Sequence, residues 1–451
     1  MKTRRFFALF LLLSLLFSLW TAPSAAAVED PNILAKAALL VDAGTGGIVY
    51  GKNEHQELYP ASLTKIMTAL LVLDAVEAGQ LSLDQELTAT ASALEGLSDD
   101  GSSAGIKVGE TMTVRNLLYC MLVVSANEAC DILAEGVAGS VSAFVEKMNA
   151  KAAELGCENT HFVNPNGLHD SQHYTSAWDL YLITSAALKH AEFLPICDTA
   201  DIVIPATNLS AERHLYTTNN LLSSWRVIGY RNKEAHGIKT GSTSEAGHCL
   251  VSSATRGSLS FISVILGADR VEENGVGNIR SFSETTRMFN YGFENFSYQT
   301  IVSATEVVKE VPVSLSKIDH VTVHPAEDVE ALLPKDLGAA ELERTVVMQD
   351  PVEAPVKEGD KLGTLELSQD GTVYASVELL AMHDVEASAL LVFWRDVQLF
   401  FSRTSVRITA AVLLVLAVAV LAWKLLLGRR RYRYGRSVGS GRSGGYRGRR
   451  R

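Results

Sequence analysis

Apolar residues form one long run near each end of the chain and shorter, periodic stretches between them. The first run, Phe6–Trp20, follows three basic residues within the first five positions and precedes the small residues 24–27. A basic stretch, an apolar stretch and small residues in this order are typical of a secretory signal peptide. We therefore predict a signal peptide over residues 1–27, cleaved before Val28.

The second run, Ile408–Trp423, contains no charged residue, and Leu425–Leu427 extend it beyond Lys424. A helix needs about 20 apolar residues to cross a bilayer, so the run predicts a membrane helix over residues 406–427. Residues 428–451 are rich in Arg, Gly and Ser, and positive charge marks the cytoplasmic side of a membrane helix. We expect a single-pass cell-membrane protein with an extracytoplasmic body and a cytoplasmic basic tail that contacts anionic lipid.

Between these runs the pattern changes from strands to helices and back. Apolar stretches at 37–41 and 48–51 flank a Gly-rich turn, which predicts a β-hairpin. Residues 62–77 are apolar nearly all round, as in a buried central helix. The order of elements indicates an α+β domain over residues 28–297 whose chain ends return to one sheet. The further helices and strands expected in it are Val114–Val124, Asn127–Gly136, Val141–Leu155, Ala177–Lys189, His236–Thr240, Gly247–Ala254 and Leu259–Leu266.

From Tyr298 onwards the chain consists of short Val-rich stretches separated by turn residues. Such stretches predict a small all-β domain over residues 298–386. Residues 387–405 carry several aromatic side chains and predict an interfacial link to the membrane helix. The strands expected in the β domain are Val307–Val313, Val321–His324, Thr345–Met348, Thr364–Leu367 and Val373–Val377.

The charge distribution makes the body more acidic than the whole chain. The formal net charge is -11, but residues 28–428 hold 27 basic and 51 acidic residues because ten Arg lie in the tail. A surface this acidic repels phosphate groups, which argues against nucleic acid as a partner.

Neither the histidines nor the cysteines have the spacing of metal ligands. Several of the cysteines lie in apolar stretches, where a buried free thiol is common, and their odd number leaves at least one unpaired. We expect no metal, no cofactor and no essential disulfide, and we interpret the histidines as loop or surface residues. The residues concerned are His161, His169, His173 and His236, and Cys120, Cys130, Cys157, Cys197 and Cys249.

Ser62 and Lys65 lie three positions apart at the start of the expected buried helix, so their side chains share one helical face. A serine hydroxyl is a weak nucleophile that needs a nearby base. A lysine amine can be that base only if burial or a neighbouring cation lowers its pKa. The helix N-terminus adds a field that suits an oxyanion. A Ser-x-x-Lys pair on its own is nevertheless common by chance.

Two later polar segments can complete such a site. Ser125–Asn127 lies between two apolar segments, where a tight turn can point side chains into a cleft, although both Ser and Asn are also ordinary helix caps. Lys239–Gly241 ends an expected strand and precedes Ser242. This segment offers a cation, a hydroxyl and, at the glycine, room for a substrate backbone.

The three segments together, in this order, resemble the S-x-x-K, S-x-N and K-T-G motifs of penicillin-binding proteins and serine β-lactamases. Their surroundings, at residues 59–68, 162–168 and 237–241, are similar to those of the low-molecular-mass D-alanyl-D-alanine carboxypeptidases (peptidase family S11). Residues 354–385 are similar to the C-terminal β domain of that family. The resemblance covers about residues 33–385 and implies a β-lactamase/transpeptidase-like catalytic domain.

The resemblance also implies roles for individual residues. Ser62 would form the acyl-enzyme, Lys65 would be the base that activates it, and Ser125 would relay a proton to the leaving D-Ala. The residues implied in substrate binding are Asn127, Lys239, Thr240, Gly241, Ser242 and Arg280.

Within this set, Asn127 would hold the peptide amide, and Lys239–Thr240 would recognise the terminal carboxylate. The backbone N–H groups of Ser62 and Ser242 would form an oxyanion hole. The position of Ser242 is often His in relatives, and a backbone role survives that change. Arg280 is the nearest candidate for an arginine that often assists carboxylate binding in the family, although its register is off by about one position.

By this resemblance, the chain is expected to remove the terminal D-Ala from peptidoglycan stem peptides and to bind β-lactam antibiotics as inhibitors. Two alternatives remain open. A class A β-lactamase would add a deacylating Glu in an E-x-x-L-N context, and the nearest segment, Glu212–Leu215, continues to Tyr216. An inactive cell-wall-binding scaffold would have lost a motif residue, whereas every motif residue is present.

Overall fold

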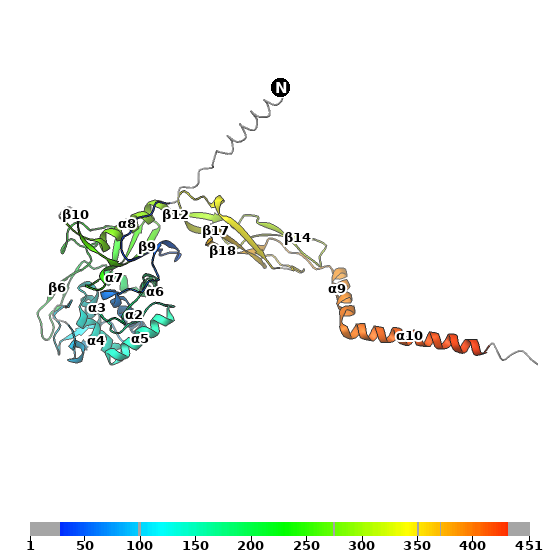
Figure 1. The fold of residues 1–451 in the computed structure, drawn as a ribbon, viewed down its shortest axis with the longest axis horizontal. Coiled ribbons are helices and arrows are strands. Elements are labelled where there is room, and N and C mark those ends of the chain that lie inside the picture. Colours follow the sequence, from blue (N-terminus) through cyan, green and yellow to red (C-terminus); the bar gives the residue numbers. More distant parts are fainter. Residues whose placement is uncertain (1–27, 98–100, 274–275, 350, 370, 432–451) are drawn as a thin grey trace, which may run out of the picture. The chain divides into compact units, whose positions relative to one another are not determined.

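Figure 1 shows the fold as a computed structural model. It describes residues 28–97, 101–273, 276–349, 351–369 and 371–431. The expected signal peptide and residues 432–451 of the basic tail lie outside the described residues. The chain divides into two compact units, of which the first comprises Met1–Ile301 and Val329–Glu343 and the second comprises Val302–Asp328 and Arg344–Arg451.

The first unit is built on an antiparallel sheet with the strand order β2-β1-β9-β8-β7. The early strand β1 pairs directly with the late strand β9, with Leu39 opposite Val264. Both faces of β1 are buried because helices cover the sheet on each side. This confirms the expected return of the chain ends to one sheet. The strands are β1 (Ala37–Asp42), β2 (Ile48–Lys52), β7 (Ala235–Thr243), β8 (Gly247–Arg256) and β9 (Leu259–Ala268).

A block of helices covers one face of this sheet. Its centre is α2 (Lys65–Glu77), in which ten residues are buried, including Lys65 itself. The sequence predicts this helix from Ser62, whereas the structure has a 3₁₀ turn, η1 (Ala61–Thr64), before α2 begins. The positive φ of Ala61, 48°, prevents a helix from extending to positions before Ser62. The other helices of the block are α3 (Val114–Val123), α4 (Asn127–Ala138), α5 (Val141–Glu154), α6 (Ala177–Ala187) and α7 (Phe193–Cys197).

The opposite face of the sheet is covered by α8 (Arg280–Asn295). Phe282, Phe289 and Phe293 of α8 are buried against Phe261 and neighbouring residues of the sheet. Four further strand pairs complete the unit, and the sequence does not predict them because most of their strands are short and partly polar. They are β3 (Glu86–Thr88) with β4 (Thr111–Thr113), β5 (Asp201–Ile204) with β6 (Arg213–Tyr216), β10 (Arg270–Glu273) with β11 (Val276–Ile279), and β12 (Phe296–Val302) with β15 (Val329–Pro334).

The second unit contains a separate five-stranded sheet, which confirms the expected all-β domain. Val321, Val323, Leu365, Leu367 and Leu379 alternate with less buried positions and form its core. Its strands, in sheet order, are β13 (Lys309–Pro312), β14 (His320–Pro325), β18 (Thr372–Ala381), β17 (Lys361–Gln369) and β16 (Glu343–Met348).

Two helices follow the β domain. The helix α9 (Ala389–Ser402) exposes its apolar side chains, among them Phe393, Trp394 and Phe401. The helix α10 (Thr404–Arg431) contains a 23-residue apolar stretch that is unburied and long enough to cross a membrane. A continuous apolar helix therefore covers the residues over which the sequence predicts a membrane helix, and it is a candidate membrane span.

Candidate active site

Ser62 lies on the 3₁₀ turn η1, which strand β7 and a loop hold in place from two sides. A Cβ at Gly241 of β7 would lie 2.8 Å from the carbonyl oxygen of Pro60 and 3.2 Å from the nitrogen of Ser62. At Gly167, a Cβ would lie 1.9 Å from the carbonyl oxygen of Ala61. The sequence predicts that Gly241 makes room for substrate, whereas the structure shows that it makes room for the backbone that carries Ser62.

The amine of Lys65 is fully buried and lies 3.0 Å from the hydroxyl oxygen of Ser62. It also donates to Oδ1 of Asn127 at 2.8 Å and to the carbonyl oxygen of Asn166 at 2.5 Å. Burial lowers the pKa of Lys65, since the charged form loses its hydration. A neutral amine has two N–H groups and one lone pair, and the two carbonyl oxygens can only accept. The lone pair is then left facing the Ser62 hydroxyl, as a general base requires.

A second amine and hydroxyl pair lies across the site. Ser125 is buried between α3 and α4 with a φ of 66°, which turns the chain sharply between the two helices. Lys239 of β7 donates to Oγ of Ser125 at 3.0 Å and to the carbonyl oxygen of Thr240 at 2.9 Å. Burial, followed by the charge of Lys65, lowers the pKa of Lys239 to about 7. At neutral pH this amine therefore exchanges a proton easily.

Of the other residues predicted to bind the substrate, Thr240 and Ser242 lie on β7, and Arg280 lies on α8. Thr240 shares a 2.6 Å hydrogen bond with the hydroxyl of Thr218. Ser242 is exposed at the same edge, one position from the end of the strand. Arg280 begins α8, and its backbone N–H donates to the carbonyl oxygen of Asp269. The contact of Arg280 with a substrate carboxylate stays a prediction.

A serine beside a buried amine whose pKa is lowered, together with a second hydroxyl and amine pair, is equipped for acyl transfer through a covalent intermediate. Residues 24–270 match the D-alanyl-D-alanine carboxypeptidase family. The chain belongs to this family. Residues 296–387 also match the C-terminal domain of penicillin-binding protein 5. Both matches agree with the family resemblance and with the fold expected from the sequence.

Named carboxypeptidases resemble the chain over most of its length. The D-alanyl-D-alanine carboxypeptidase DacF of Bacillus subtilis (strain 168) is 32% identical over 378 residues, which cover 82% of this chain and 92% of DacF. The enzyme of Streptomyces sp. (strain K15) is 33% identical over 283 residues, which cover 60% of this chain and 91% of that enzyme.

Solved structures of related proteins are also similar to this chain. The D-alanyl-D-alanine carboxypeptidase DacD of Francisella tularensis has a TM-score of 0.65 at 26% identity, covering 82% of this chain and 98% of DacD. Penicillin-binding protein 5 of Haemophilus influenzae has a TM-score of 0.63 at 29% identity, covering 80% of this chain and all of that protein. The chain is therefore a serine-type D-alanyl-D-alanine carboxypeptidase that binds penicillin, and neither the β-lactamase nor the inactive scaffold is favoured.

Two site residues of this carboxypeptidase were not assigned a role from the sequence. The backbone of Asn166 accepts from Lys65, and its side-chain amide donates to the carboxylate of Asp131 at 3.3 and 3.4 Å. Burial raises the pKa of Asp131 to about 7. An acidic residue on the apolar face of a helix, as Asp131 is on α4, was the available signal.

His173 lies in a loop, as expected, but it is buried and not at the surface. His173 is 2% exposed, and its Nε2 lies 2.8 Å from the hydroxyl of Thr64, within η1. The backbone N–H of Val163 donates to its Nδ1. Burial lowers the pKa of His173 to about 4, which keeps the imidazole neutral. This histidine therefore braces the turn that carries Ser62.

Proposed function

We propose that this carboxypeptidase removes the terminal D-Ala from peptidoglycan stem peptides through an acyl-enzyme on Ser62. The observation that carries the proposal is the contact of Lys65 with Ser62, together with the two carbonyl oxygens that occupy the other hydrogen-bonding positions of the amine. This arrangement supports a neutral lysine acting as the base.

In acylation, Lys65 takes the hydroxyl proton as Oγ of Ser62 attacks the carbonyl carbon of the penultimate D-Ala. The backbone N–H groups of Ser62 and Ser242 stabilise the oxyanion. Collapse of the tetrahedral intermediate breaks the C–N bond, and the leaving amine receives a proton through Ser125. The 3.0 Å contact of Ser125 with Lys239 supports this step because it supplies a proton donor.

Substrate binding is assigned to the edge of β7 and to Asn127. Because Oδ1 of Asn127 accepts from Lys65, its amide nitrogen is the group that can donate to the peptide. Lys239 and Thr240 bind the terminal carboxylate, and the segment from Gly241 to Ser242 lines the strand edge. Arg280 is retained as a candidate for the same carboxylate.

Water then releases the peptide, with Lys65 as the base either alone or with Ser125. The D-Ala that leaves the peptide diffuses away and admits this water, whereas the leaving nitrogen of penicillin stays tethered to the acyl group. Penicillin and other β-lactams therefore act as inhibitors. The substrate is extracytoplasmic, in agreement with a body held outside the membrane.

The proposed topology follows from the charges around α10. Its apolar stretch crosses the cell membrane, the Arg-rich tail is cytoplasmic, and membrane lipid surrounds the helix. The proposed division of the chain is a signal peptide (1–27), a catalytic domain (28–297), a β domain (298–386), a juxtamembrane link (387–405), a membrane helix (406–427) and a tail (428–451).

The deciding experiment measures two quantities on one preparation of the purified protein. The first is release of D-Ala from a peptide ending in D-Ala-D-Ala, and the second is the lifetime of the penicilloyl adduct. We expect turnover of the peptide and slow loss of the adduct. Rapid penicillin turnover without D-Ala release would instead identify a β-lactamase, and the absence of both acylation and release would identify a scaffold.

A further inference from the structure

The two carbonyl oxygens that contact the amine of Lys65 are both positioned by one face of α4. Asn127 and Asp131 lie four positions apart on this helix, so their side chains share a face. Asn127 supplies its Oδ1 to Lys65 directly, at 2.8 Å. Asp131 accepts from the side-chain amide of Asn166, whose backbone carbonyl oxygen lies 2.5 Å from the same amine. These contacts form a closed ring that begins and ends at Lys65.

The side chain of Asn166 has a defined orientation in this ring. Its Oδ1 accepts from the backbone N–H of Leu168 at 3.0 Å, so its amide nitrogen is the atom that faces Asp131. This nitrogen donates to both carboxylate oxygens of Asp131, at 3.3 and 3.4 Å. Asn166 is 3% exposed and Asp131 is 6% exposed, so little water competes for these contacts. The carboxylate therefore helps to fix the residue that supplies a carbonyl oxygen to Lys65.

Asp131 is a buried carboxylate without a direct ion pair. Within the described part of the chain, the amide of Asn166 is the group that donates to its oxygens. Burial raises the pKa of Asp131 to about 7, and the nearby amine of Lys65 opposes this rise. In the same way, burial lowers the pKa of Lys65, and the negative charge of Asp131 opposes that change. Each group therefore favours the charged form of the other.

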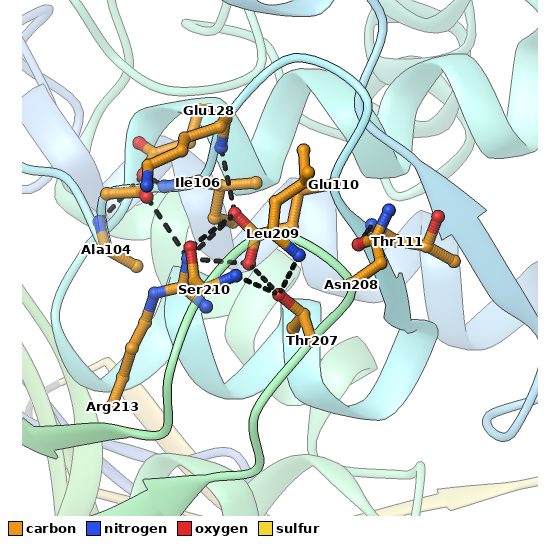
Figure 2. Close-up of polar contacts among 12 residues, drawn as sticks. Ala104, Ile106, Glu110, Thr111, Glu128, Thr207, Asn208, Leu209, Ser210 and Arg213 are labelled. Carbon is orange, nitrogen blue, oxygen red and sulfur yellow. Dashed lines mark hydrogen bonds and ion pairs between the residues drawn. The ribbon is translucent and has the colours of Figure 1, made fainter.

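Glu128, the other buried carboxylate of α4, has a structural partner of its own. It accepts from the backbone N–H of Ala104 at 2.7 Å and so holds the segment before the helix (Figure 2). Figure 2 also shows Glu110, a further buried carboxylate, which pairs with Arg213 at 2.6 Å. The contact of Asp131, by contrast, leads to the proposed base.

Three other titratable groups interact electrostatically with Lys65. His173 is uncharged near pH 7 because burial lowers its pKa to about 4. Cys130 is uncharged as well because burial raises the pKa of its thiol to about 12. Lys239 does change its charge in this range, since burial lowers its pKa to about 7. An experiment on Asp131 must therefore cancel the contribution of Lys239.

The geometry points to Asp131 as a positioning residue that acts on Lys65 through Asn166. In acylation, Lys65 takes the hydroxyl proton of Ser62 and becomes a cation, which the carboxylate of Asp131 stabilises. No proton passes to Asp131 in this step. The inference rests on the proposed function, in which Lys65 is the base, and deepens it by identifying a negative charge that makes this buried amine more basic.

The test measures the rate constant of acylation by saturating fluorescent penicillin, from about pH 5 to about pH 9, on the full-length protein in detergent. Asp131→Asn keeps the size of the side chain and an oxygen that accepts from Asn166, but it removes the charge. We expect this variant to be about tenfold slower than the wild type at the alkaline end. At the acid end it should approach the wild-type rate, because Asp131 is itself uncharged below its pKa of about 7. The ratio of the two rates cancels the contribution of Lys239.

Two further variants sharpen the comparison. Glu135→Gln removes a carboxylate one turn further along α4 and is the matched control, with a ratio near one at every pH. Combining Asp131→Asn with Asn166→Asp exchanges the two groups, which returns both a charge and a hydrogen bond to the pair. This double variant should recover most of the rate that Asp131→Asn loses at the alkaline end.

Three outcomes would overturn the inference: a ratio near one for Asp131→Asn at every pH, an equal loss at every pH, or a folded double variant that is as slow as Asp131→Asn. The second outcome is the one that a merely structural role would give. Failure of the proposed function would look different, because the wild type itself would then release no D-Ala or Lys65→Ala would keep its acylation rate. Thermal unfolding at both ends of the pH range identifies any variant with a folding defect.

Discussion

Nζ of Lys239 lies 3.0 Å from Oγ of Ser125, although 114 positions separate the two residues in the chain. The contact joins the end of the helical block to the edge strand of the sheet. Both groups are buried, so water does little to stabilise the charged form of the lysine. The neighbouring groups therefore have a larger effect on its pKa. The protonation state of Lys239 therefore depends on the assembled site. Substrate binding is expected to depend on pH for this reason.

We expect KM for a D-Ala-D-Ala peptide to rise as pH increases through about 7. Lys239 loses its proton there, since its pKa is lowered to about 7 by burial, and the carboxylate then loses one cation. Lys239→Arg should flatten this rise because arginine keeps its charge. The measurement is steady-state kinetics across the pH range. A wild-type KM that stayed constant would contradict the role of Lys239.

Lys65→Ala should reduce the acylation rate by about a thousandfold, the usual contribution of a general base. Lys65→Arg should be equally slow, because arginine cannot accept a proton. Fluorescent penicillin measures the rate, and Lys189→Ala, at an exposed helix end, is the control. If Lys65→Ala kept most of the rate, another base would have to be found.

Ser62→Ala should abolish covalent labelling by fluorescent penicillin, since no other hydroxyl adjoins the amine of Lys65 in the described site. Mass spectrometry of the wild-type adduct should find the penicilloyl group on Ser62. Ser244→Ala, at an exposed position beyond β7, should label normally. Normal labelling of a folded Ser62→Ala protein would refute the assignment.

Glu110→Gln should lower the free energy of unfolding by about 3 kcal/mol, because it leaves the buried guanidinium of Arg213 without its counter-ion. Denaturant unfolding measures the loss. Glu245→Gln changes an exposed carboxylate and should be close to neutral. Equal stability of the two variants would show that the buried pair contributes nothing.

Truncation after Arg403 should release a soluble enzyme that still binds penicillin, because it removes α10 as a whole. Cell fractionation followed by labelling tests this outcome. Retention of the truncated protein in the membrane fraction would identify α9, with its exposed Phe393 and Trp394, as a second anchor.

The periodicity of apolar residues predicted the long elements well, because burial of one face of an element requires apolar residues at regular spacing. The hairpin of β1 and β2, the helix α2 and the strands β8 and β9 all lie close to their expected positions. The short pairs β3–β4 and β5–β6 were missed because three or four partly polar residues carry too little pattern. Yet all four residues of β6 line a cavity of about 530 Å³.

The sequence also singled out Ser62, Lys65, Ser125 and Lys239, and the structure brings them together as two contacting pairs. Their catalytic roles stay predictions. Contacts made by backbone groups could not be predicted from sequence motifs. Asn166 acts on Lys65 by its carbonyl oxygen, a group that every residue possesses. Only the three-dimensional path of the chain distinguishes it from its neighbours.

The pairing of β1 with β9 has a consequence for the order in which the enzyme becomes active. β1 is made early, but its partner on one side is among the last segments of the catalytic unit to be synthesised. The reactive serine is made early as well, while the lysine opposite it arrives with β7. An unfinished or prematurely terminated chain therefore cannot acylate. Pairing between such distant strands is also slow, so the sheet that holds the site cannot be completed until synthesis of this unit is nearly finished.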